Sequence, residues 1–293
     1  MKIRFLKDLA VVVIGGCLLT ACTTLRHSER VELEGSAVGY ASVGEGDVTI
    51  VLESGLGDGM TSWDGIMDEL AQISRVFAYS RPGYFPSRAS NRSRNPDQVV
   101  DELRLLLKQT GHTPPYLLVG HSLGGLYVLN FVERYPGEVA GVVLVDGRHP
   151  MMTQACLKRA LNGCSMPSLV QSLLPRHAVD EYKAVQTSRL PVTMGDKPLA
   201  VISRAPGHGI NSAGWDKLWS EMQVDLAELS SRSIHLVARR GGHYVHKDEP
   251  DRVIEGINWV LSKVRSDTRI GNDMKGRKGN RGHARLTPVR SIR

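Results

Sequence analysis

Short apolar runs alternate along this chain with longer segments in which apolar residues recur every three or four positions. A short continuous run is typical of a strand buried on both faces, and the second spacing gives a helix one apolar face. The runs predict strands over residues 38–43, 48–52, 75–79, 117–119, 141–145, 197–203 and 233–238. Because the strands alternate with helical segments, we expect an α/β fold with a mostly parallel sheet flanked by helices.

The helical segments lie between these strands. Apolar positions repeat at helical spacing over residues 62–73, 126–135, 215–229 and 250–264. A further helix is predicted to begin at Asn95, whose side chain can cap the first turn, and to continue through Pro96. Gly111 suits its end, because glycine readily adopts the left-handed conformation that follows many helices.

The beginning of the chain has a different pattern. Basic residues precede an apolar run over 9–19, which is too short to span a bilayer comfortably and is typical of a secretory signal peptide. The run leads into Leu-Thr-Ala-Cys22, which resembles the lipobox of bacterial lipoproteins. The resemblance implies a signal peptide over 1–21 and lipidation at Cys22, followed by a linker over 22–30. Cys17 marks a weaker competing cleavage site.

Lipidation would anchor the domain to a membrane of the bacterial cell envelope, facing the periplasm or the exterior. An uncleaved anchor or an ordinary signal peptide is the alternative. The two remaining cysteines, Cys156 and Cys164, lie close together in the sequence. In an oxidising compartment such a pair predicts a disulfide, and two free thiols are the alternative.

The positive charge is confined to one end of the chain. The formal net charge is +7, and residues 265–293 alone hold nine Lys or Arg against two Asp. The interval 266–293 is therefore expected to be a disordered basic tail, either simply solvated or in contact with anionic lipid. The intervening residues 31–265 have no net basic character and are of a length suited to one α/β domain. An exported chain without interleaved aromatic residues in its basic tail is not expected to bind nucleic acid.

Candidate chemistry begins at the sequence Gly-His-Ser122-Leu-Gly, which follows an apolar run and precedes a helical segment. Glycines at this spacing fit a sharp turn from strand to helix that would crowd any larger side chain. Such a turn exposes the serine hydroxyl at a helix N-terminus, where negative charge is favoured. A Gly-rich turn with a capping serine is the alternative.

Two further segments belong with this serine. Asp146 follows the apolar run 141–145, and Gly-Gly-His243 follows the run 233–238. Parallel sheets bind ligands beyond the carboxyl ends of their strands, so Ser122, Asp146 and His243 are expected at the same edge.

Four turn sequences in this order give the chain a resemblance to the α/β-hydrolases. They are Glu-Ser-Gly-Leu-Gly at 53–57, Ser-Arg-Pro-Gly-Tyr at 80–84, the turn around Ser122, and Gly-Gly-His-Tyr at 241–244. The resemblance covers residues 38–264 and implies an α/β-hydrolase fold in which Ser122 is a nucleophile and His243 its base. The histidines His121, His208 and His246 are the competing candidates for the base.

The third member of the triad departs from the family pattern. Many members carry the acid after the strand that precedes the last one, but here that strand leads into Ser203-Arg204-Ala205. Asp146 is the best substitute, at a position that some members use, and Asp225 is the alternative. A capping or turn role for Asp146 also stays open.

The family pattern also implies an oxyanion hole made by the backbone N–H groups of Leu56 and Leu123. It places a small helical lid over residues 148–196. The lid contains apolar residues that suit either an acyl group or simply the core of the lid: Met151, Met152, Met166, Leu169, Leu173 and Leu174.

Together these features predict a serine hydrolase that cleaves a small-molecule carboxylic ester through an acyl-serine intermediate. No metal or other cofactor is expected. The fold also hosts acyltransferases, thioesterases, amidases and peroxidases, so these activities remain alternatives. A non-catalytic binding lipoprotein on the same fold is the contrasting hypothesis.

Overall fold

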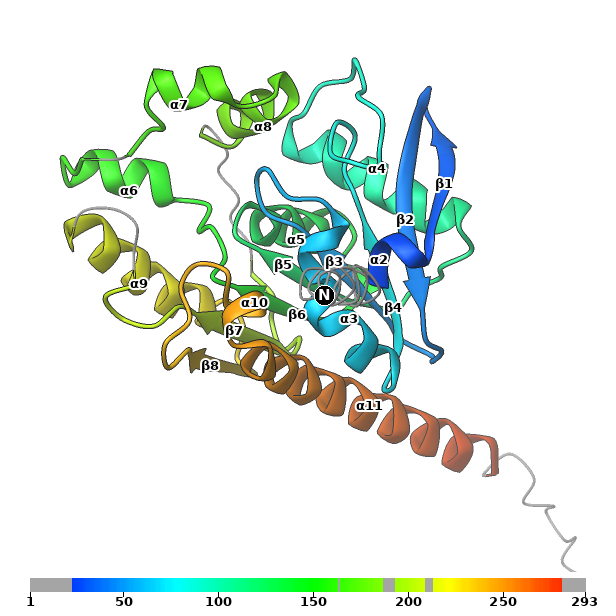
Figure 1. The fold of residues 1–293 in the computed structure, drawn as a ribbon. Helices are drawn as coiled ribbons and strands as arrows, with labels where there is room; N and C mark the ends of the chain where they lie inside the picture. Colours follow the sequence, from blue (N-terminus) through cyan, green and yellow to red (C-terminus); the bar gives the residue numbers. More distant parts are fainter. Residues whose placement is uncertain (1–22, 163, 187–192, 209–212, 281–293) are drawn as a thin grey trace, which may run out of the picture.

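The computed structural model describes residues 23–162, 164–186, 193–208 and 213–280, and a single sheet runs through them (Figure 1). Its strand order is β1-β2-β4-β3-β5-β6-β7-β8, with β1 and β2 antiparallel to their neighbours and all later pairs parallel. The strands are β1 (Ser28–Leu33), β2 (Ser36–Val43), β3 (Thr49–Glu53), β4 (Arg75–Tyr79), β5 (Tyr116–His121), β6 (Val139–Val145), β7 (Leu199–Ser203) and β8 (Ser233–Val237). This arrangement confirms the predicted fold class.

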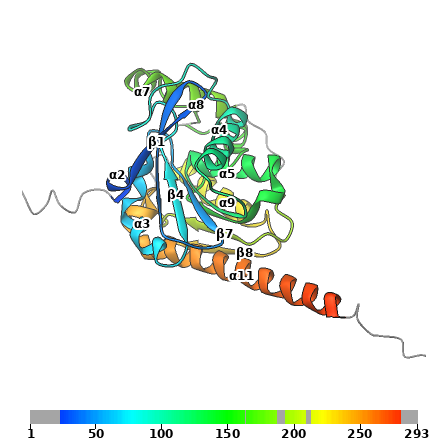
Figure 2. The same ribbon diagram turned by 90° about the vertical axis from the view of Figure 1, so that its right-hand side faces the viewer.

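Helices cover both faces of the sheet. Its central strands are therefore buried on both sides. On one face, α4 (Pro96–Gln109) and α5 (Leu123–Arg134) pack against side chains such as Val51 and Leu118. On the other, α3 (Asp64–Ala71) and α11 (Pro250–Asn280) cover neighbours such as Ile50 and Val119. Figure 2 shows the two helical layers on opposite sides of the strands. Among the described residues, no helix combines the length and the apolar character needed to cross a membrane.

The termini of α4 agree with the local sequence. The Asn95 side chain accepts a hydrogen bond of 2.8 Å from the backbone N–H of Gln98, which satisfies one of the free donors in the first turn. The helix ends at Gln109, and Gly111 follows it with a φ of +77°. Both predicted ends of this helix are confirmed.

The predicted linker over 22–30 is wrong for most of its length. A short helix, α2 (Thr23–Arg26), and the first residues of β1 occupy this interval, so the folded domain begins before residue 31. β1 pairs with β2 along its whole length, from Ser28 opposite Ala41 to Leu33 opposite Ser36. Its sequence carries no apolar run, because the outermost strand of a sheet is largely exposed to solvent.

The prediction of disorder over 266–293 is wrong for residues 266–280, because α11 continues to Asn280. Two contacts support the extension beyond the last core residues. Asp267 pairs with Arg232 at 2.9 Å, and the Thr268 hydroxyl donates to the carbonyl of Val264 at 3.0 Å. Lys, Arg and Met are also good helix formers, so a basic sequence is compatible with a helix. The rest of the predicted tail, 281–293, and the predicted signal peptide lie outside the described residues.

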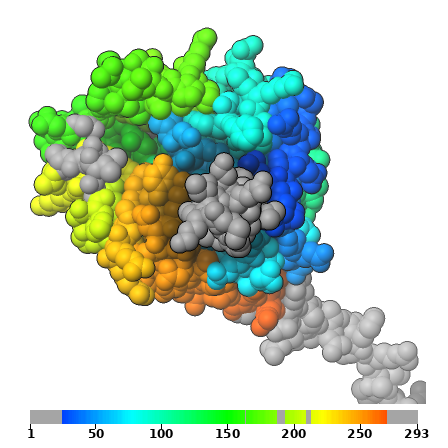
Figure 3. Space-filling view, in the orientation of Figure 1, coloured from blue at the N-terminus to red at the C-terminus, as the bar shows by residue number. Residues whose placement is uncertain are grey.

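The interval between β6 and β7, predicted as the lid, contains α6 (Met152–Lys158), α7 (Ser168–Leu173) and α8 (Arg176–Gln186). A disulfide joins Cys156 to Cys164, with 5.4 Å between their Cα atoms. Apolar residues of α6 pack against α9 (Ala213–Ala227), with Met152 and Cys156 against Trp215 and Trp219. In the space-filling view the green surface of the lid lies near the yellow surface of α9 (Figure 3).

Candidate active site

Ser122 lies in the sharp turn between β5 and α5. Its backbone has φ +51° and ψ −117°, a conformation that side-chain-bearing residues rarely adopt and that persists only when surrounding contacts fix it. Three backbone hydrogen bonds do so here: its N–H donates to Val145 at 3.1 Å, and its carbonyl accepts from Gly125 at 3.1 Å and from Arg148 at 2.8 Å. The turn therefore holds the serine hydroxyl in one place.

The glycines beside this serine are required by close backbone approach. A Cβ atom on Gly120 would lie 2.7 Å from the backbone of Gly124. A Cβ atom on Gly124 would lie 2.3 Å from the carbonyl oxygen of Glu53. Both distances are shorter than a carbon atom can tolerate against backbone, so the Gly-x-Ser-x-Gly spacing follows from the packing of this turn.

A hydrogen-bonded chain links Ser122, His243 and Asp146. His243 Nε2 lies 2.9 Å from Ser122 Oγ, and His243 Nδ1 lies 2.6 Å from Asp146 Oδ2. Asp146 is fully buried at the end of β6, and His243 lies in the loop between β8 and α10 (Val245–Asp248). The three side chains that the sequence suggested separately thus meet at the carboxyl edge of the sheet.

Asp146 has donors on both of its carboxylate oxygens. Trp219 Nε1 and the backbone N–H of Arg204 donate to Oδ1 at 2.9 and 3.2 Å, and the Arg204 guanidinium donates to Oδ2 at 3.2 Å. Arg204 also pairs with Asp216 at 3.0 Å. It follows β7, the strand end where the family pattern led us to look for the acid. An arginine there instead of a carboxylate was a signal that the acid comes from elsewhere, but the sequence did not reveal its contact with Asp146.

Glu249 fixes the loop that carries His243. The Glu249 carboxylate accepts hydrogen bonds of 2.6 Å from the backbone N–H groups of Arg240 and Gly241, and one of 3.1 Å from that of Arg239. Sequence reasoning missed this residue, because its partners are backbone groups and carry no side-chain signal.

The competing histidines have other surroundings. His121 Nε2 contacts the carbonyl oxygen of His243 at 2.9 Å, and burial together with the neighbouring His246 and His243 lowers the pKa of His121 well below its ordinary value. Burial lowers the pKa of His246 to about 3, and neither of its ring nitrogens has a hydrogen-bond partner among the described residues. His208 is exposed in the loop after β7.

Asp225, the alternative acid, also lies apart from the triad. It is exposed on α9, and its charge raises the pKa of His149, partly opposing the effect of burial on that histidine. The geometry therefore favours Asp146 over Asp225 as the partner of His243.

The loop that contains Leu56 is fixed by a buried arginine. Arg81, in the turn after β4, donates to the carbonyl oxygens of Ser54 and Gly55 at 2.7 and 2.8 Å. Leu56 lines the same cavity as Ser122 and Leu123, and the oxyanion-hole role of the two leucine N–H groups stays a prediction. The role of Arg81 could not be read from its motif alone.

Arg81 also belongs to a buried charge network. Its guanidinium pairs with Glu53 at 2.5 Å and with Glu181 of α8 at 3.0 Å, and Tyr79 donates to Glu53. Burial alone would lower the pKa of Arg81, but the charges on Glu181 and Glu53 outweigh it and raise this pKa well above its ordinary value. Burial raises the pKa of Glu53, and Arg81 and Tyr79 partly oppose this effect. The network thus connects the lid, the Leu56 loop and the end of β3.

A cavity of about 500 Å³ opens above the serine. The lid and α9 supply most of its walls, which are largely apolar. Its lining consists of Leu56, Ser122, Leu123, Arg148, Met152, Cys156, Cys164, Ser165, Met166, Pro167, Val170, Tyr182, Val185, Arg204, Trp215, Trp219 and His243. Among the described residues, no cluster of three or more His, Cys, Asp or Glu side chains could hold a metal ion.

Comparison with known proteins agrees with this architecture. Residues 48–165 match the family model described as alpha/beta hydrolase fold. A thermophilic esterase from Thermogutta terrifontis, solved with malate bound, superposes with a TM-score of 0.64 at 18% identity, covering 80% of this chain and 99% of the esterase. The strand order and these matches assign the chain to the α/β-hydrolase fold.

Two curated proteins add more specific relatives. The chain is 27% identical over 218 residues to the uncharacterized protein YqjL of Bacillus subtilis, covering 71% of this chain and 81% of YqjL. It is 29% identical over 100 residues to the (lyso)-N-acylphosphatidylethanolamine lipase of Mus musculus, covering 33% of this chain and 29% of the lipase.

Proposed function

We propose that this protein is a serine esterase that cleaves a carboxylic ester through an acyl-serine intermediate. The observation that carries the proposal is the continuous chain from Ser122 Oγ through the His243 ring to the buried Asp146 carboxylate. A carboxylate can only accept, so Nδ1 of the neutral ring carries the proton and Nε2 is left to accept the serine proton. This is the arrangement that a general base needs.

The reaction follows from these positions. As Ser122 Oγ attacks the ester carbonyl, His243 takes its proton, and Asp146 stabilises the imidazolium that forms. The backbone N–H groups of Leu56 and Leu123 would stabilise the oxyanion. His243 then returns the proton to the departing alcohol, and a water activated by the same ring hydrolyses the acyl-serine.

The cavity supports an apolar acyl or alkyl group as part of the substrate. Lid and α9 side chains such as Val170, Val185 and Trp215 line it, and adaptable methionines contribute to the wall. The esterase and lipase named among the similar proteins support the ester assignment. Thioester hydrolysis, acyl transfer and peroxidase chemistry would use the same triad and remain the alternative activities.

A fluorophosphonate probe tests the nucleophile. We expect the folded protein to be labelled, and Ser122→Ala to abolish labelling and to lower ester hydrolysis on the order of 10⁵-fold. Ser165→Ala is a matched control, because this serine lines the same cavity without contacting His243 among the described residues. Absence of labelling in a folded wild-type protein would refute the proposal.

The acid is tested by comparing two isosteric variants. Asp146→Asn should lower kcat by roughly 10³- to 10⁴-fold, because an amide does not hold the productive tautomer of the histidine. Asp225→Asn should retain wild-type turnover, since that carboxylate is exposed on α9. Full activity in the Asp146 variant, measured with a soluble 4-nitrophenyl ester, would reject the assignment.

We further propose that the enzyme is lipid-anchored at Cys22 to a membrane of the bacterial cell envelope. The lipobox-like sequence before Cys22 supports this location. Expression with an alkynyl fatty acid should label the wild-type protein and the Cys17→Ser variant but not the Cys22→Ser variant. Equal labelling of all three proteins would rule out Cys22 as the attachment site.

A further inference from the structure

One arginine in the cavity wall, Arg148, has no charged partner among the described residues. Arg148 follows β6 and lines the cavity together with Ser122 and His243. Among the described residues, its guanidinium has one hydrogen-bond partner, the Thr153 hydroxyl at 2.6 Å, and forms no ion pair with a carboxylate. A guanidinium has five N–H donors, so most of its capacity to bind an acceptor is unused.

The other arginine of the cavity has a different environment. Arg204 is neutralised by Asp146 at 3.2 Å and by Asp216 at 3.0 Å. Among the residues that the structure describes, no Asp or Glu lines the cavity wall. Within that part of the chain, the positive charge of Arg148 is therefore the one charge of the lining that no carboxylate compensates.

Placing such a charge in a largely apolar cavity is costly. Burial lowers the pKa of Arg148, and the neighbouring Tyr182 opposes this effect only in part. Arg148 is half-buried, so its guanidinium loses part of its hydration without gaining an anion among the described residues. An anionic group on a bound molecule would compensate the positive charge of Arg148. Carboxylates and phosphates match the forked geometry of arginine best.

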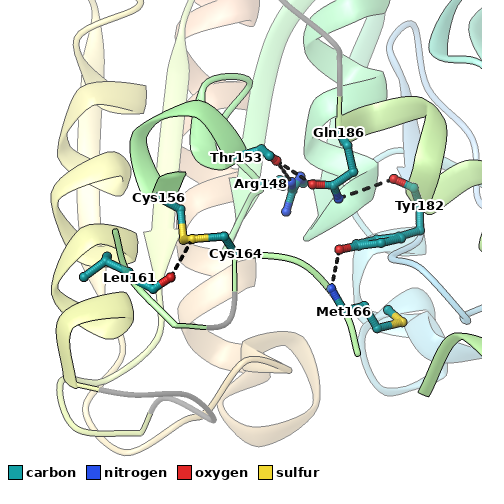
Figure 4. Close-up of a disulfide and its surroundings, with 8 residues drawn as sticks. All are labelled: Arg148, Thr153, Cys156, Leu161, Cys164, Met166, Tyr182 and Gln186. Atoms are coloured by element: carbon teal, nitrogen blue, oxygen red, sulfur yellow. Dashed lines mark hydrogen bonds between the residues drawn. A yellow bond between two sulfur atoms is a disulfide. The ribbon is translucent and has the colours of Figure 1, made fainter. Parts of the chain in front are cut away.

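Lid residues hold the guanidinium in place. Thr153 of α6 accepts from Arg148 and donates to Gln186 Oε1 at 2.7 Å, and Gln186 in turn donates to the carbonyl of Tyr182 at 3.4 Å. The Tyr182 hydroxyl accepts from the backbone N–H of Met166 at 2.5 Å. Figure 4 shows this chain of contacts from Arg148 to α8, with the disulfide on the other side of the cation.

The backbone of Arg148 contacts that of the serine. The Arg148 N–H donates to the Ser122 carbonyl at 2.8 Å, and this hydrogen bond couples the positions of the two backbone segments. Both residues also line the same cavity, so one bound substrate can contact the serine and the arginine.

We propose that Arg148 is a specificity-determining residue that binds an anionic group, a carboxylate or a phosphate, on the ester substrate. The inference rests on the proposed esterase function and narrows it to acidic esters. The apolar wall receives the hydrocarbon part of the substrate, the serine receives the ester carbonyl, and Arg148 receives the charge.

The test compares matched ester pairs that differ only in charge. Mono-4-nitrophenyl glutarate and 4-nitrophenyl valerate have acyl chains of equal length, one ending in a carboxylate and one in a methyl group. For the phosphate arm, a 1-acylglycerol 3-phosphate is compared with the same 1-acylglycerol. The measured quantity is the ratio of kcat/KM for the acidic ester to kcat/KM for its neutral partner. Charged hydrogen bonds predict that Arg148→Met lowers this ratio by about 10- to 100-fold in the arm that matches the natural anion.

Two further variants separate charge from structure. Arg148→Lys keeps the charge without the fork and should retain a larger ratio than Arg148→Met. Arg176→Met removes an exposed lid arginine from α8 and should leave the ratio unchanged. With the wild-type enzyme alone, hexyl phosphate should inhibit hydrolysis of the valerate ester at least about tenfold more strongly than hexanol, which tests the site without any substitution.

The outcomes are distinct. A drop confined to the glutarate pair identifies a carboxylate, and a drop confined to the glycerol pair identifies a phosphate. Ratios independent of Arg148 in both arms, with equal inhibition by hexyl phosphate and hexanol, would overturn the inference while leaving a Ser122-dependent esterase intact. Hydrolysis that persists in Ser122→Ala would instead reject the proposed function.

Discussion

Arg81 and Arg148 differ in what their guanidinium groups bind. Arg81, beneath the Leu56 loop, contacts two carboxylates and two backbone carbonyls. Arg148, facing the cavity, contacts one hydroxyl among the described residues. The difference shows how partner counting separates an arginine that stabilises the fold from one that is open to a ligand.

The largest effect is expected for Arg81→Met. It would leave Glu53 buried without its cation and would leave Glu181 with the longer contact to Arg94 at 3.5 Å. Breaking a buried pair in this way costs about 3–5 kcal/mol of unfolding free energy. Urea denaturation measures the change.

Arg104→Met is the matched control, because its pair with Glu138 is exposed and should contribute at most about 1 kcal/mol. Equal losses of unfolding free energy in the two variants would show that the buried pairs of Arg81 stabilise the fold no more than an exposed pair does.

His246 is a buried group that, unlike an arginine, can lose its charge near neutral pH. His246 is neutral in the folded protein because burial lowers its pKa to about 3, whereas the unfolded chain has an ordinary histidine pKa near 6.5. The unfolded state therefore binds more protons between these values, so the stabilising contribution is complete above pH 6.5 and is lost as pH falls toward 3.

His246→Leu should remove this dependence. We expect the fall in unfolding free energy between pH 6 and pH 4.5 to become shallower by up to about 1.4 kcal/mol per pH unit. Denaturant curves at several pH values measure the slope. His208→Leu serves as the control, since this histidine is exposed and its removal should leave the slope as it is. An unchanged slope in the His246 variant would show that the ring is protonated in the fold.

The smallest effect on stability is expected for Arg148→Met. The substitution removes an uncompensated cation and one hydrogen bond, and Thr153 keeps its bond to Gln186. A flexible apolar chain of similar length can fill the space, so the free energy of unfolding should change by less than about 1 kcal/mol in either direction. A loss as large as that of Arg81→Met would assign Arg148 a structural role.

The sequence predicted the central sheet and the main members of the site for a physical reason. Buried parallel strands are continuous apolar runs, and the sharp turn at Ser122 excludes side chains beside it, so both leave a local signal. The edge strand β1 left no such signal, because three of its six residues are exposed to solvent and two more are partly exposed.

Other features depend on contacts between distant parts of the chain. Arg81 and Glu181 are separated by 100 positions, and Arg204 and Asp146 by 58. Neither pairing could be predicted from the residue types alone. The continuation of α11 to Asn280 was missed because the basic composition suggested disorder, although the same residues are good helix formers.

The ion pair between Glu181 and Arg81 has a consequence for protein engineering. Lids of this fold are attractive segments to exchange when a new substrate range is wanted. In this chain α8 supplies the Glu181 carboxylate to Arg81, the arginine that holds the Leu56 loop. A lid grafted from another protein of this fold would remove that carboxylate and leave Arg81 with Glu53 as its carboxylate partner among the described residues. A successful chimera should therefore carry an acidic residue at position 181 or exchange Arg81 together with the lid.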